Sequence, residues 1–189
     1  MDTMCLIRTL DTCVSHLSST GGDWSARIPG LNWTVADCVA HIAEGLLWYA
    51  TDLVAGHREL STMDMKVRPA SSPDDLIRTV STFGTVLVRT VEASPPAAVG
   101  WHPYGLGDAS AFAAMGCAEL LVHTHDASLG LETSFTPDPA LAEATLERLF
   151  PDAPGGHPAW ETLLWAHNRV PLADFPRPDG WRWTLGSMS

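Results

Sequence analysis

The sequence predicts an all-α protein, a four-helix bundle followed by additional short C-terminal helices and an extended tail. Three observations indicate this class: apolar residues recur every three or four positions in several long segments, capping residues precede those segments, and no segment alternates convincingly as a strand would. The chain has 189 residues, 46% hydrophobic and only 17% charged, which is typical of a packed globular protein. We therefore expect one domain over residues 1–189, with the core bundle over 1–135 and a helical extension over 136–189.

The first two helices are predicted from their periodicity and their ends. The first is expected over roughly residues 2–17, where leucines recur at helical spacing until two glycines follow. The second begins after Thr34, which together with Asp37 has the form of a capping box. Its apolar residues then alternate at spacings of four and three as far as Gly56, as in the packing seam of a bundle helix.

Two long connections flank the third helix. The first, residues 57–71, has no clear period. Ser72 and Pro73 then supply an N-cap and a first-turn proline for a helix that stops before Pro95. The second connection, residues 97–107, is expected to be a loop, and its aromatic residues make it a candidate wall or lid for a pocket.

The remaining elements follow in order. A fourth helix is expected from a cap at Asp108 to Gly130, within an Ala- and Leu-rich run. Shorter helices are expected over residues 139–150 and 158–170, each opened by a proline. The tail, residues 176–183, is too rich in proline and aromatic residues for a helix, and we expect an extended strap.

Charge and composition exclude several kinds of partner. The formal net charge of −11, from 11 Lys and Arg against 22 Asp and Glu, opposes binding to nucleic acid or to anionic lipid surfaces. No run is long and apolar enough to span a membrane, and the N-terminus lacks the pattern of a secretory signal. The four cysteines form no CxxC pair. We therefore expect a cytoplasmic monomer or homodimer that acts on small molecules.

A metal site is the candidate chemistry. Glu119 and His123 lie one helical turn apart in an otherwise apolar run, so that both can face one cation. His41, in the second predicted helix, offers a third ligand. Each residue alone has an ordinary explanation, as a solvated helix residue or a hydrogen-bonded histidine. The combination is more informative, because bundle interiors often hold metal sites built from facing helices.

The apolar surroundings of Glu119 favour the metal interpretation. It is the only acidic residue between Asp108 and Asp126, and an unpartnered carboxylate would be costly to bury there. Two histidines and one carboxylate leave coordination positions open, as in catalytic zinc sites, although non-haem iron uses the same set. We expect a divalent metal, with zinc as the first choice and nickel or iron as alternatives.

Further residues are candidates for supporting roles. Asp37 and Asp126 each lie about one turn from a proposed histidine ligand and could accept its ring N–H, although Asp37 serves equally well as a helix cap. Arg169 could bind an anionic substrate group or pair with a nearby acid. The candidate pocket residues are Trp48, Trp101, His102, Tyr104 and Arg169.

Three small residues near the ligands have two interpretations each. Gly45 and Gly116 either leave room for a substrate or permit close helix packing. Cys38, one turn before His41, is either a fourth ligand or a buried thiol, and its apolar neighbours favour the thiol.

Two of these segments carry a resemblance to a known family. The segment from Trp33 to His41 resembles the tryptophan-to-histidine segment of the DinB/YfiT-like superfamily, and within it proteins grouped with the N-terminal domain of mycothiol-dependent maleylpyruvate isomerase. The segment from Glu119 to Asp126 looks like the second metal motif of that group. The ending Trp181-Arg182-Trp183 is similar to that of small members.

The resemblance spans most of the chain and implies a DinB-like four-helix bundle with a divalent metal, usually zinc, on His41, Glu119 and His123. It also implies a low-molecular-weight thiol, such as mycothiol or bacillithiol, that the metal activates for isomerisation or S-transfer. The chain departs from the family in carrying His125 where an aromatic residue is common, and in lacking the additional C-terminal domain of the full isomerase. The substrate of that isomerase is therefore not implied.

Three function hypotheses follow from the sequence. The leading one is a metal-dependent thiol-using enzyme, an S-transferase or isomerase of the mycothiol type, that acts on a small electrophile. The second is a non-catalytic metal-binding bundle with a role in stress response. The third is a metal-assisted hydrolase or a tailoring enzyme of secondary metabolism that uses water in place of the thiol.

Overall fold

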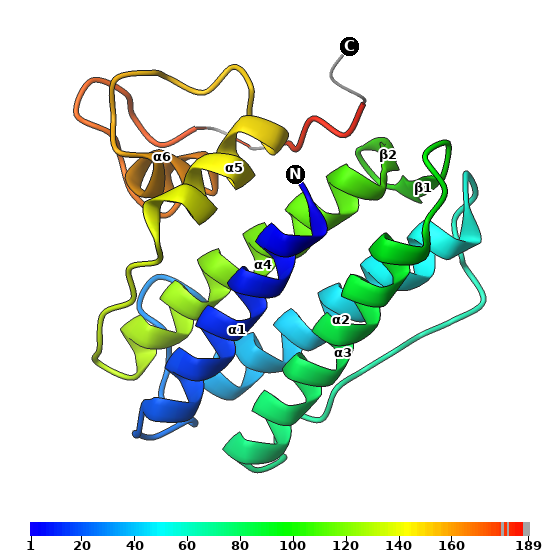
Figure 1. Ribbon diagram of the computed structural model, residues 1–189. Coiled ribbons are helices and arrows are strands. Elements are labelled where there is room, and N and C mark those ends of the chain that lie inside the picture. Colours follow the sequence, from blue (N-terminus) through cyan, green and yellow to red (C-terminus); the bar gives the residue numbers. More distant parts are fainter. Residues whose placement is uncertain (179, 181, 187–189) are drawn as a thin grey trace.

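The structure is a computed structural model that describes residues 1–178, 180 and 182–186. Within this part the chain is mostly helical, with six helices and one two-stranded antiparallel hairpin (Figure 1). The prediction of a mostly helical chain is therefore confirmed. Among the described residues, no helix is both long and apolar enough to cross a membrane.

Four long helices account for the first two thirds of the chain. Three of the predicted caps form: Thr34, Ser72 and Asp108 each accept a hydrogen bond from the backbone N–H three residues later. The helices are α1 (Thr3–Ser19), α2 (Val35–Ala55), α3 (Pro73–Ala93) and α4 (Ala109–Gly130). They run side by side, with α2 packed on both α3 and α4, and α1 packed on the other sides of α3 and α4 (Figure 1).

The central helix is α4, which is buried almost all round. Every residue from Ala111 to Val122 is buried, so this helix has no polar face. Glu119 is the only charged side chain in that buried stretch. The position of α4 therefore places a carboxylate in the core of the helical assembly.

The prediction of a loop over residues 97–107 was wrong in part. Strands β1 (Val99–His102) and β2 (Gly105–Asp108) form a hairpin in which His102 is opposite Gly105. Each strand has only four residues, too few to show alternation, and Gly105 makes the turn with a positive φ of 131°. Trp101 N–H donates to the carbonyl oxygen of Gly56 at 2.8 Å, which holds the hairpin against the end of α2.

The C-terminal segment packs beside this assembly. Helix α5 (Pro139–Leu149) lies on α4 and α1, and α6 (Ala159–Ala166) lies on α5 and ends short of the predicted residue 170. The described tail residues have no helix, in agreement with the expected extended strap, and Trp181 lies outside the described residues. The buried guanidinium of Arg148 binds Asp108 and the carbonyl oxygens of Thr184 and Leu185, which fastens the tail to the start of α4.

Candidate metal centre

Three sequence-predicted ligands converge where α2 packs on α4. His41 comes from α2, and Glu119 and His123 come from adjacent turns of α4. Glu119 Oε2 lies 3.2 Å from His123 Nε2 and 3.6 Å from His41 Nε2. One potential ligand atom from each residue lies within 4.8 Å of the others, so a single cation could contact all three.

The second oxygen of Glu119 provides a test of whether these residues fit a metal. Glu119 is only 8% exposed, and its Oε1 accepts a hydrogen bond from the Tyr49 hydroxyl at 2.8 Å. Oε2 is buried and has no hydrogen-bond partner among the described residues. A buried carboxylate oxygen without a donor is costly, and a cation shared with the two imidazoles would satisfy it. The donor set therefore fits a divalent metal.

The electrostatics of the cluster keep this carboxylate ionised. Burial alone would raise the pKa of Glu119, but the neighbouring imidazoles of His123 and His41 and the hydrogen bond from Tyr49 lower it to about 2. Burial lowers the pKa of His41. Burial also acts to lower the pKa of His123, but Glu119 and Asp126 outweigh it and raise that pKa well above the usual range.

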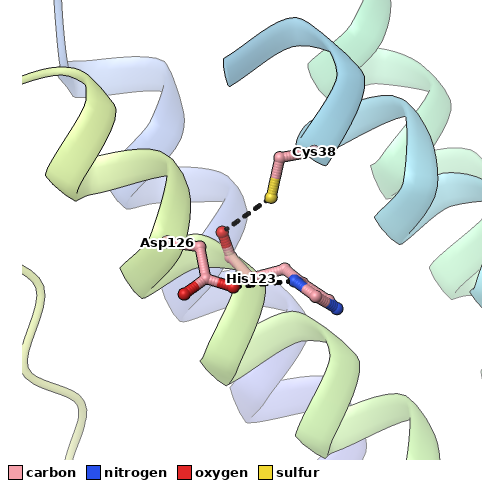
Figure 2. A group of neighbouring side chains, drawn as sticks. All are labelled: Cys38, His123 and Asp126. Atoms are coloured by element: carbon pink, nitrogen blue, oxygen red, sulfur yellow. Dashed lines mark hydrogen bonds and ion pairs between the residues drawn. The ribbon is translucent and has the colours of Figure 1, made fainter. Parts of the chain in front are cut away.

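His123 is held by a chain of hydrogen bonds that continues to the C-terminal segment. Its Nδ1 lies 3.0 Å from Asp126 Oδ2, so that Nδ1–H donates to this carboxylate and Nε2 is left facing Glu119 (Figure 2). Arg169 in turn donates to Asp126 through Nε at 2.9 Å and Nη2 at 2.7 Å. Asp126 thus lies where a residue that orients His123 was expected.

A second group, Cys38 with His123 and Asp126, also has potential ligand atoms within 4.8 Å of one another. Figure 2 shows that Cys38 and Asp126 instead hold His123 in place. The Cys38 thiol donates to the His123 carbonyl oxygen, at 3.4 Å, and the Asp126 carboxylate points at the His123 ring. Burial raises the pKa of the Cys38 thiol, which opposes the thiolate form that metals bind. Arg169 already balances the charge of Asp126.

The structure gives Asp37 the capping role and not the orienting one. Its Oδ2 accepts hydrogen bonds from the backbone N–H and the hydroxyl of Thr34, and these bonds lower its pKa. Gly116 serves helix packing, because a Cβ there would lie 2.6 Å from Leu87 Cδ2. A Cβ at Gly45 would meet Glu119 at an ordinary distance of 3.6 Å.

The three residues open onto a cavity of about 370 Å³. Three predicted pocket residues, His102, Tyr104 and Arg169, line it. The other two, Trp48 and Trp101, line an adjoining cavity of about 530 Å³ instead. The two cavities share four lining residues: His41, Tyr49, His102 and Pro103.

Three residues of the site were not identified from the sequence. The Trp33 ring lies over both imidazoles, with its centroid 4.7 Å from that of His41 and 5.7 Å from that of His123. Tyr49, which donates to Glu119, is one of the apolar residues of the α2 packing seam, and it follows His41 by about two turns on that helix. Trp183 also lines the smaller cavity, and no sequence signal connected it with residues so far away in the chain.

Comparison with known proteins gave one match. A family model described as mycothiol maleylpyruvate isomerase N-terminal domain matches residues 4–128, a segment that contains His41, Glu119 and His123 but neither Arg169 nor Trp183. Comparisons with curated proteins and with solved structures found no match.

Proposed function

The chain belongs to the mycothiol maleylpyruvate isomerase N-terminal domain family, and on this basis we propose that it is a metal-dependent, thiol-using enzyme. It transfers a thiol of the mycothiol type to a small electrophile, or uses that thiol to isomerise one. The same membership leads us to assign α1–α4 to a DinB-like four-helix bundle with the metal centre in its interior.

One observation carries the proposal: the buried Oε2 of Glu119 faces two imidazole nitrogens at the wall of a cavity, and it has no hydrogen-bond partner in the part of the chain that the structure describes. A purely structural carboxylate in the core would be expected to have donors on both oxygens. Two nitrogens and one oxygen are a ligand set that suits zinc, and nickel or iron are the alternatives.

The residues of the centre have two roles: three would bind the metal, and two hold those ligands in position. His41, Glu119 and His123 would hold the metal, which when bound supplies the positive charge that keeps a thiol deprotonated, and hence nucleophilic, at neutral pH. Tyr49 holds Oε1 of Glu119, so that Oε2 is the oxygen left to face the imidazoles. Asp126 holds the proton of His123 on Nδ1, which leaves Nε2 as the ligand atom.

Aromatic side chains around the cavity would position the electrophile and exclude water. Trp33 covers the imidazoles, and the hairpin brings His102 and Tyr104 against the tail residue Trp183, with ring centroids 5.4 and 6.0 Å from that of Trp183. Such a lining suits a small unsaturated or aromatic molecule better than a large polar one.

The metal is tested by elemental analysis of the purified protein and its variants. We expect close to one divalent ion per chain in the wild type, and loss of most of it in His41→Ala and in Glu119→Ala. His125→Ala is the matched control, because His125 lies on the same helix and contacts Trp160 instead of the cluster. Equal metal content in all four proteins would show that the site is misassigned.

The thiol is tested by incubating the metal-loaded protein with a halogenated aromatic electrophile, with and without mycothiol. We expect product to form faster than the uncatalysed reaction only when the thiol is present. Hydrolysis of test substrates without any thiol would favour a metal-assisted hydrolase. No acceleration by a protein with full metal content would favour a non-catalytic metal-binding bundle.

A further inference from the structure

Two cysteine thiols meet where α1 packs on α4. Cys5 lies in the first turn of α1, where its backbone N–H donates to Asp2 at 2.8 Å, and Cys117 lies in the buried stretch of α4. The Cys117 thiol donates a hydrogen bond to the Cys5 sulfur. Cys117 precedes Glu119 by two residues, which is roughly 200° around the helix, so it lies on a different face of α4 from the metal ligands. The pair therefore belongs to the interface between the two helices and lines neither cavity of the metal centre.

The packing of α1 on α4 holds the two thiols in register. Beside the pair, Leu6 Cδ1 of α1 lies only 3.2 Å from where a Cβ at Gly116 of α4 would be, so the missing side chain lets the helices approach closely. About three turns later, His16 Nε2 lies 2.9 Å from Ser128 Oγ. These contacts join residues with nearly the same separation along the chain, so the two helices run parallel, side by side (Figure 1). The contact between the thiols is thus set by the packing of two long helices.

The cysteines differ in access and in reactivity. Cys5 is partly exposed, whereas Cys13, Cys38 and Cys117 are buried. The hydrogen bond from Cys117 lowers the pKa of Cys5 to about 7, although burial and the charge of Asp2 act to raise it, so that much of Cys5 is a thiolate at neutral pH. Burial instead raises the pKa of Cys13 to about 12. An accessible, nucleophilic sulfur in contact with a second thiol is the arrangement of cysteines that are oxidised and then joined.

We propose that Cys5 and Cys117 form a site of oxidation by hydroperoxides, in which Cys5 is oxidised first and Cys117 then closes a disulfide between α1 and α4. The site is separate from the metal centre, and its chemistry needs neither the metal nor the thiol cosubstrate. The disulfide would tie α1 to the helix that carries Glu119 and His123.

The reaction balances with one hydroperoxide for each disulfide. The Cys5 thiolate attacks one peroxide oxygen, the S–O bond forms as the O–O bond breaks, and the departing hydroxide takes up a proton to become water. The Cys117 sulfur then attacks the sulfur of the Cys5 sulfenic acid. The S–S bond forms as the S–O bond breaks, and the oxygen leaves as water with the proton of the Cys117 thiol. Exchange with a reducing dithiol restores both cysteines.

The experiment treats zinc-loaded protein with hydrogen peroxide, follows the remaining thiols and maps unreduced peptides by mass spectrometry. We expect two of the four thiols to be lost together and the peptides that contain Cys5 and Cys117 to be joined within one chain. Cys5→Ser should slow thiol loss at least about fivefold, because the larger thiolate fraction of Cys5 outweighs its lower intrinsic nucleophilicity. Cys117→Ser should leave Cys5 as a sulfenic acid, which dimedone captures.

Cys13→Ala is the matched control, because Cys13 lies on the same helix as Cys5 but is fully buried. It should form the same disulfide at the wild-type rate. Circular dichroism melting establishes that each variant is folded before oxidation, and the peptide map of the wild type decides the result if a variant is not. Thiol loss in the wild type no faster than in Cys5→Ser, a link between two chains, or no peptide joined through Cys5 and Cys117 would overturn the inference. The proposed function would stand in each case, because its tests measure metal content and thiol transfer.

Discussion

Arg169→Met removes the cation that balances the most deeply buried acid of the site. Arg169 reaches Asp126 with three N–O contacts, from Nε at 2.9 and 3.1 Å and from Nη2 at 2.7 Å. Asp126 is only 2% exposed. Without the guanidinium, its remaining side-chain partner among the described residues is the ring of His123.

The expected cost follows from leaving a buried charge without its counter-ion. Removing one partner of a buried, hydrogen-bonded ion pair typically costs about 3–5 kcal/mol of unfolding free energy. In a chain of this size that loss lowers the melting temperature by roughly 10 °C. The variant should also retain metal less well, because Asp126 would no longer be held in place beside His123.

The assay is equilibrium unfolding in urea with a chelator present, so that metal binding does not contribute. Arg8→Met is the matched control: Arg8 also pairs with an aspartate, Asp138, at 2.6 Å, but the two side chains are 56% and 46% exposed. Its loss should cost less than about 1 kcal/mol. If Arg169→Met costs no more than Arg8→Met, the reasoning about the buried pair is refuted. Adding Asp126→Asn to Arg169→Met should restore part of the stability, because it removes the uncompensated charge.

Three further outcomes are expected. Burial lowers the pKa of His167 from 6.5 to about 4, so the unfolded state takes up a proton first as pH falls, and stability should drop by about 3 kcal/mol between pH 6.5 and 4. Urea unfolding of His167→Gln across that range should lack this component, and parallel curves for variant and wild type would contradict it. Gly116→Ala places a methyl group 2.6 Å from Leu87 and should cost about 1–3 kcal/mol in thermal unfolding, whereas Gly45→Ala should be neutral or stabilising; equal melting temperatures would argue against the packing role. Thr34→Ala removes the cap of α2 and should cost about 1 kcal/mol by urea unfolding, which Thr34→Ser should largely restore.

The helix boundaries could be predicted because they depend on residues close together in the chain. Thr34, Ser72 and Asp108 each bond to a backbone N–H three residues later, and such contacts form wherever that short segment is helical. The hairpin after α3 was not predicted, because its two strands of four residues are defined by pairing and by packing on Gly56. Short strands of this kind carry too little periodicity to be recognised.

The sequence alone was enough to predict the mostly helical fold and the family. Its spacing also predicted that Glu119 and His123 lie on one face of α4. Only the tertiary structure decided that the Tyr49 hydroxyl takes one oxygen of Glu119 across 70 residues and that Arg169 holds Asp126 across 43. The physical reason is range: caps and helical periodicity depend on neighbours within a few residues, whereas contacts between distant side chains depend on how whole helices pack.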